Sequence, residues 1–136
     1  MLLTRTHVGC FVSFFILSGA VSAKTNSDCL KHLGGGYGDA QCYRAMSVDL
    51  LAENEKLYRS VRATIPARND HAMLLDEYVM AANSATKFCS LQRDAGAKWE
   101  KSPDGSMFPA LYEQCIYEAR VAQNKFLRNL SDMAKW

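Results

Sequence analysis

Five cysteines are the side chains with the widest chemical repertoire in this sequence. A cysteine can act as a nucleophile, bind zinc or form a disulfide. Zinc sites usually contain closely spaced cysteine or histidine pairs, and here only His32, three residues after Cys29, comes near that pattern. We therefore expect disulfides, with no metal site and no cofactor. Cys10 lies inside an apolar N-terminal run, and the other four follow at spacings of 13, 47 and 26: Cys29, Cys42, Cys89 and Cys115.

The remaining reactive side chains show no catalytic pattern. His32 and His71 stand alone in polar surroundings, and the sequence contains no Gly-x-Ser-x-Gly or His-Glu-x-x-His motif. The adjacent carboxylates of Asp76 and Glu77 fall on an expected outer helix face, where charges are usually solvated. We expect this protein not to be an enzyme.

The first 23 residues have the layout of a secretory signal peptide. Arg5 and His7 supply a short basic start, residues 8–17 form an uncharged apolar run, and small residues follow up to Ala23. Ten apolar residues in a helix span about half of a bilayer core of about 30 Å, which disfavours a membrane anchor. We expect cleavage after Ala23, a single mature domain over residues 24–136, and a periplasmic or secreted location where cysteines are oxidised.

The charge of the mature chain is nearly balanced. Removing Arg5 from the 16 basic side chains leaves 15 against 14 acidic ones, and the two signs are interspersed. Proteins that bind nucleic acid carry a basic stripe, and proteins that bind anionic membranes carry a basic amphipathic helix. Neither pattern is present, so we expect no nucleic acid and no membrane as partner.

Apolar residues at spacings of three, four and seven predict three helices and no strand. Asp39 is expected to cap the first helix, which runs to about Arg62 and ends before Pro66, because proline disfavours helix in the preceding residue. The second starts near residues 69–70 and reaches 99–101, and the third follows a Ser106 cap. The expected inner residues of the first helix are Tyr43, Met46, Leu50, Leu57, Tyr58 and Val61. Those of the second are Leu74, Tyr78, Ala81, Ala82, Ala85, Phe88, Cys89 and Gln92, and those of the third are Phe108, Tyr112, Cys115, Ala119, Ala122, Phe126, Leu130 and Met133.

These segments predict an all-α fold, an up-down-up three-helix bundle with a short disulfide-tethered N-terminal loop. Asn54 interrupts the apolar face of the first helix, so we expect it to be buried with a polar partner. The topology gathers the four mature cysteines at one end and places Cys89 level with both Cys42 and Cys115. Geometry therefore leaves the pairing open. We favour Cys29–Cys42 with Cys89–Cys115, because the first bridge closes a short glycine-rich loop and the second joins a level pair.

The glycine-rich loop is the candidate binding element. Glycines at this density break both helix and strand, so residues 34–38 are expected to be irregular. A tyrosine flanked by glycines is unobstructed and offers a large contact area at low entropy cost. In the alternative interpretation, Tyr37 folds back over the two disulfides. The candidate partner-binding residues are Gly35, Gly36, Tyr37 and Gly38.

One set of residues forms the pattern of a known family: the four mature cysteines, Tyr37, Tyr43, Leu51, Leu57, Tyr58, Leu75, the Asp-Gly-Ser-Met stretch at 104–107, Pro109, Arg120 and Leu127. In these residues the mature sequence resembles the lysozyme inhibitor LprI-like family of small exported proteins. Residues 81–88 depart from that family, since they contain neither the Trp nor the Arg-Asp pair that members often carry there. The resemblance implies a helical, disulfide-bridged, periplasmic or secreted protein that binds a protein partner, namely lysozyme or another envelope protein. An immunity-type partner and a structural or envelope-stress protein are the alternatives.

Overall fold

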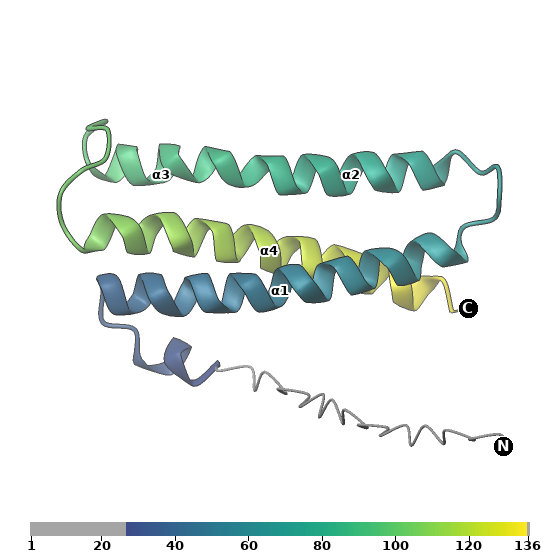
Figure 1. The fold of residues 1–136 in the computed structure, drawn as a ribbon, viewed down its shortest axis with the longest axis horizontal. Coiled ribbons are helices and arrows are strands. Elements are labelled where there is room, and N and C mark those ends of the chain that lie inside the picture. The colour runs from purple at the N-terminus through teal and green to yellow at the C-terminus, as the bar shows by residue number, and fades with distance from the viewer. Residues whose placement is uncertain (1–26, 136) are drawn as a thin grey trace, which may run out of the picture.

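The computed structural model describes residues 27–135, and all regular elements in that range are helices. Three helical limbs run up, down and up, as Figure 1 shows. The first is α1 (Tyr37–Thr64), preceded by the short 3-10 helix η1 (Ser27–His32). The second joins α2 (His71–Ala85), the 3-10 turn η2 (Thr86–Phe88) and α3 (Cys89–Gly96), and the third is α4 (Met107–Met133). The predicted all-α three-helix bundle is confirmed, while the expected signal peptide lies outside the described residues.

The first helix starts earlier than predicted. Gly36 is its N-cap, and the Gly36 carbonyl accepts a hydrogen bond from the Ala40 amide at 3.0 Å. The first turn therefore already contains Tyr37, which was expected to lie in the loop. The other end agrees with the prediction, because α1 ends against Ile65 in extended conformation.

The second limb ends earlier than predicted. Lys98 and Trp99 have φ angles of 54° and 71°, which a right-handed helix does not contain. The helix therefore stops at Gly96, and residues 97–106 form the turn into α4. Ser106 is the residue before α4, as expected, although its hydroxyl makes no cap hydrogen bond. None of the described helices combines the length and the hydropathy that crossing a membrane requires.

α1 and α4 are the main packed pair of the bundle, and they run in the same direction (Figure 1). Their contacts keep a nearly constant offset in sequence: Arg44 lies 69 residues before its partner Glu113, and Asn54 lies 70 before Asn124. The Arg44 Nη2 donates to Glu113 Oε1 at 2.7 Å, and the Glu113 side chain is buried. A buried carboxylate is costly without a charged partner, so this ion pair favours one alignment of the two helices.

The faces that the helices bury differ from the predicted stripes. In the third limb the predicted inner residues Phe126 and Met133 are exposed, because polar side chains occupy the side of α4 that meets α1. In the second limb the predicted inner residues Leu74 and Phe88 are exposed, while Leu75 is buried. Those four predictions were wrong, and so were those for Ala81, Ala85, Gln92 and Ala122, which are also exposed. The buried residues of α4 are Ala110, Glu113, Gln123, Asn124 and Leu127.

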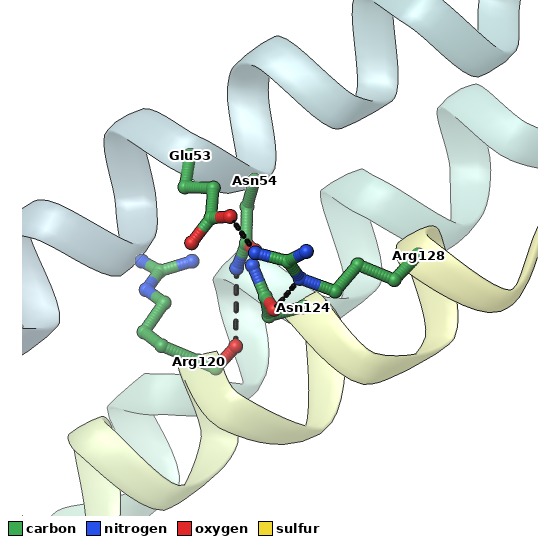
Figure 2. A network of polar contacts seen from close by, with 5 residues as sticks. All are labelled: Glu53, Asn54, Arg120, Asn124 and Arg128. Atoms are coloured by element: carbon green, nitrogen blue, oxygen red, sulfur yellow. Dashed lines mark hydrogen bonds and ion pairs between the residues drawn. The ribbon is translucent and has the colours of Figure 1, made fainter. Parts of the chain in front are cut away.

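A cluster of buried amide side chains centres on Asn54, which is only 2% exposed. Its Nδ2 donates to the Arg120 carbonyl and to Gln123 Oε1, each at 3.1 Å. Asn124 Nδ2 donates to Asn54 Oδ1 at 2.8 Å, and Arg128 Nε donates to Asn124 Oδ1 at 2.8 Å (Figure 2). The prediction that Asn54 is buried with polar partners is confirmed. Both N–H groups of its amide donate, and its Oδ1 accepts one hydrogen bond.

Two arginines extend this amide cluster. The guanidinium of Arg120 donates to the side-chain oxygen of Asn83, so the cluster also reaches the second limb. The guanidinium of Arg128 pairs with Glu53 on α1, where Figure 2 shows the two side chains meeting. Burial lowers the pKa of Arg120 from its usual value. The cluster thus connects all three limbs through side chains whose hydrogen bonds have fixed geometry.

Replacing Asn54 by alanine should destabilise the protein by about 3 kcal/mol, because Asn124, Gln123 and a backbone carbonyl each lose a buried partner. Denaturant unfolding of purified protein measures this change. Asn129→Ala is the matched control on an exposed position of α4, and it should shift the free energy of unfolding by less than about 0.5 kcal/mol. Equal effects of the two variants would contradict a structural role for the amide cluster.

Candidate functional site

Both disulfides lie at one end of the bundle. Cys29–Cys42 ties η1 to α1 with the Cα atoms 5.8 Å apart, and Cys89–Cys115 ties α3 to α4 with the Cα atoms 5.6 Å apart. These are the pairs favoured from the sequence. Bridges of this span each stabilise a fold by roughly 3–4 kcal/mol on a chain-entropy estimate. We call this region the cysteine end. It comprises residues 28–42, the α3–α4 turn at 97–106 and the start of α4.

The glycine-rich loop is held by the side chain of Asp39. Its Oδ1 accepts a hydrogen bond from the Gly34 amide at 3.1 Å, and its Oδ2 accepts one from the Gly35 amide at 2.6 Å. Asp39 was expected to cap the helix from outside. It lies instead in the first turn of α1 and fixes the loop that leads into the helix. The irregular segment is therefore short, and its backbone is anchored on both sides by Asp39 and by the Cys29–Cys42 bridge.

Gly36 forms the contact between the glycine-rich loop and the α3–α4 turn. Its φ and ψ of 110° and −157° belong to a region that is essentially restricted to glycine. A Cβ atom at this position would lie 3.0 Å from Ser106 Oγ and 3.3 Å from Ser106 Cβ. Gly36 is buried, so it supports the surface from beneath. Of the four candidate residues, Gly35, Tyr37 and Gly38 are the exposed ones.

Tyr37 points into solvent with 63% of its surface exposed. The alternative in which it covers the disulfides is therefore wrong. Trp99 in the α3–α4 turn is 67% exposed, and Leu33 and Met107 are also exposed large apolar residues of the cysteine end. Because Gly36 packs against Ser106, the start of α1 that carries Tyr37 and the α3–α4 turn that carries Trp99 belong to one end of the molecule (Figure 1).

Trp99 was not among the residues singled out from the sequence. It was read as the last turn of a helix, where its exposure could not be foreseen. Its positive φ, together with those of Lys98 and Ser102, places strained backbone in this turn. Residues held in such conformations cluster at functional sites. A tryptophan four residues before the Pro-Asp-Gly turn at 103–105 is the sequence signal that could have marked it.

The two histidines do not meet. His32 is exposed at the end of η1, whereas His71 opens α2 at the opposite end, with its Nδ1 2.6 Å from Asn69 Oδ1. Within residues 27–135 no group of three or more His, Cys, Asp or Glu side chains is arranged to hold a metal ion. The arrangement that stands out chemically at the cysteine end is an exposed aromatic surface on a cross-linked support.

The chain matches no protein-family model, no curated protein and no solved structure. Function is therefore inferred from its own residues. The Asp-Gly-Ser-Met stretch of the resemblance includes Ser106, the residue that Gly36 packs against. Two parts of that resemblance, the tyrosine after the first cysteine and this turn, thus meet at the cysteine end.

Replacing Gly36 by alanine should destabilise the protein by about 2 kcal/mol or more, because a non-glycine residue is strained there and the added Cβ crowds Ser106. Gly34→Ala is the matched control: its Cβ would meet nothing within 4 Å, and it should leave the free energy of unfolding within about 0.5 kcal/mol. Thermal and denaturant unfolding of both variants provide the measurement. A neutral Gly36→Ala would mean that the loop does not rest on Ser106.

Proposed function

We propose that this protein is an exported binding module, without enzyme activity, that acts by direct contact between its cysteine end and a protein partner. The partner class implied by the resemblance is lysozyme or another wall hydrolase. Export agrees with the signal-peptide layout of residues 1–23 and with two disulfides, which form and persist in oxidising compartments.

The observation that carries the proposal is the exposure of Tyr37 and Trp99 on one cross-linked end. Tryptophan and tyrosine are the residues most enriched among interface hot spots. Monomeric proteins usually cover such side chains, and clusters of exposed apolar residues mark interaction sites. Leu33 and Met107 add apolar surface to the same end.

Rigidity of the support favours binding. A preorganised loop loses less conformational entropy when it binds, and affinity rises accordingly. Here the Asp39 carboxylate, the Cys29–Cys42 bridge and the Gly36–Ser106 contact fix the backbone under Tyr37 before any partner arrives. An inhibitor needs little more than this, since it works by occupying the cleft of its target.

Electrostatics contributes little to long-range attraction in this proposal. The charge of the whole chain is +2, and the charged residues of the α3–α4 turn, Lys98, Glu100, Lys101 and Asp104, nearly cancel one another. Association with a basic lysozyme would therefore proceed without strong steering. We expect the binding energy to come from apolar contact, and the affinity to depend weakly on salt concentration.

Tyr37→Ala and Trp99→Ala should each weaken capture of the partner about 30-fold, the effect of losing a hot-spot side chain worth about 2 kcal/mol. Both side chains are exposed, so the melting temperature should stay almost unchanged. The measurement is titration of purified protein against lysozymes of several structural types and other wall hydrolases, by residual activity and by direct binding.

Met80→Ala is the control, since Met80 is an exposed apolar residue of α2 away from the cysteine end, and it should bind like the unmodified protein. If the unmodified protein neither binds nor inhibits any hydrolase tested and captures no envelope protein, the proposal fails. If all three variants weaken binding equally, the contact surface lies elsewhere.

A further inference from the structure

A cavity of about 420 Å³ lies at the end of the bundle opposite the cysteines. Its walls come from the last turns of α1, the first half of α2 and the last turns of α4, which meet at the right of Figure 1. Val61 and Leu75 of the hydrophobic core form its floor, and Tyr78, Phe126 and Leu130 line its sides. No Asp, Glu, Lys or Arg is among the lining residues of the described chain.

The cavity exists because the helices diverge there. The α1–α4 pair is closely packed, whereas α2 touches it lightly. Near this end α2 is tied to α1 by the Asp76 carboxylate, which accepts hydrogen bonds from Tyr58 Oη at 2.8 Å and Arg62 Nε at 3.2 Å. These hydrogen bonds set the distance between α2 and α1. The apolar residues between α2 and α4 do not fill the space that remains.

Its size indicates the class of occupant. A cavity of about 150 Å³ lined by apolar side chains holds one benzene molecule, and pockets that bind small molecules start at about 300 Å³. A single aromatic side chain from a protein partner would therefore fill only about a third of this cavity. An extended hydrocarbon chain of about twelve carbons has a volume that matches it.

Few polar groups line the cavity, and they belong to residues of its otherwise apolar walls. The Tyr78 ring packs against Phe126 with centroids 4.3 Å apart, and among residues 27–135 its hydroxyl has no hydrogen-bond partner. Burial raises the pKa of Tyr78, so the hydroxyl stays neutral and able to donate. At the edge, His71 has its Nδ1 engaged by Asn69, which leaves Nε2 free. An occupant that is mostly apolar and carries one polar group suits this lining.

We propose that this cavity binds the hydrocarbon chain of a single-chain amphiphile, such as a fatty acid of about twelve carbons. The site is separate from the cysteine end, so it neither depends on the proposed protein partner nor competes for the same surface. Occupation would fill the space between α2 and α4 and bury the exposed apolar side of Leu74.

The experiment titrates the mature protein with dodecanoate and with dodecyl maltoside, each below its critical micelle concentration, by calorimetry and thermal unfolding. We expect one site per chain for both probes, a melting temperature that rises with ligand concentration, and the tightest binding near twelve carbons when shorter and longer fatty acids are compared. Tyr78→Phe should weaken dodecanoate about tenfold or more, as expected for one lost hydrogen bond to a charged group.

A pair of matched substitutions locates the site. Leu74 and Leu91 are similarly exposed, at 60% and 55%, but only Leu74 lines the cavity. Leu74→Asp should weaken both probes about tenfold or more, because it places a charge against an apolar ligand, and Leu91→Asp should leave binding within about twofold. The inference is overturned if neither probe binds at any concentration up to its critical micelle concentration, if the two Asp variants lose binding equally, or if only peptides with apolar side chains bind there.

Discussion

The buried amide cluster around Asn54 is the interaction on which the rest of this structure depends. Fully buried apolar side chains are few, and several of those that are buried are alanines or cysteines: Ala40, Cys42, Val61, Leu75, Cys89, Ala110 and Leu127. Apolar contacts of this kind tolerate sliding of one helix along another, whereas hydrogen bonds between amides do not. Asn54 can satisfy both of its amide atoms in only one alignment of α1 with α4. The ion pair between Arg44 and the buried Glu113 favours the same alignment two to three turns away.

Different interactions hold the two ends of the bundle together. At the cysteine end the covalent bridges and the close contact of Gly36 with Ser106 remove freedom from the backbone, so exposed aromatic residues stand on a fixed support. At the other end only polar ties to Asp76 hold α2, and the helices leave a cavity lined by Tyr78 and Phe126. One end of the fold thus carries exposed aromatic residues on a fixed support, and the other contains an apolar cavity.

Periodicity and turn chemistry carried the prediction of the fold. The three limbs, the break at Pro66 and the burial of Asn54 follow from periodicity and turn residues. The cysteine pairs are those that were favoured between two arrangements that the topology allows. The buried faces of the helices were not predicted correctly, because the side of α4 that meets α1 is built from Glu113, Gln123 and Asn124. A search for apolar stripes cannot find a polar interface. Such partners become visible only when helices distant in sequence are placed together.

The candidate site was predictable in part for a related reason. A glycine-rich segment between two cysteines marks a restrained loop, and Tyr37 at its end is exposed. The role of Gly36 depends on Ser106, seventy residues later, and the exposure of Trp99 depends on where the second limb stops. Both are consequences of tertiary packing and of positive φ angles, which composition does not reveal.

Hydrogen exchange under native conditions, measured residue by residue, tests most directly whether the amide cluster organises the bundle. The account predicts that backbone amides of α1 and α4 around Asn54 and Asn124 open only with global unfolding, while those of α2 near Leu74 open at a lower free energy. Equal or greater protection near Leu74, or opening of the α1–α4 centre before the rest of the molecule, would contradict it.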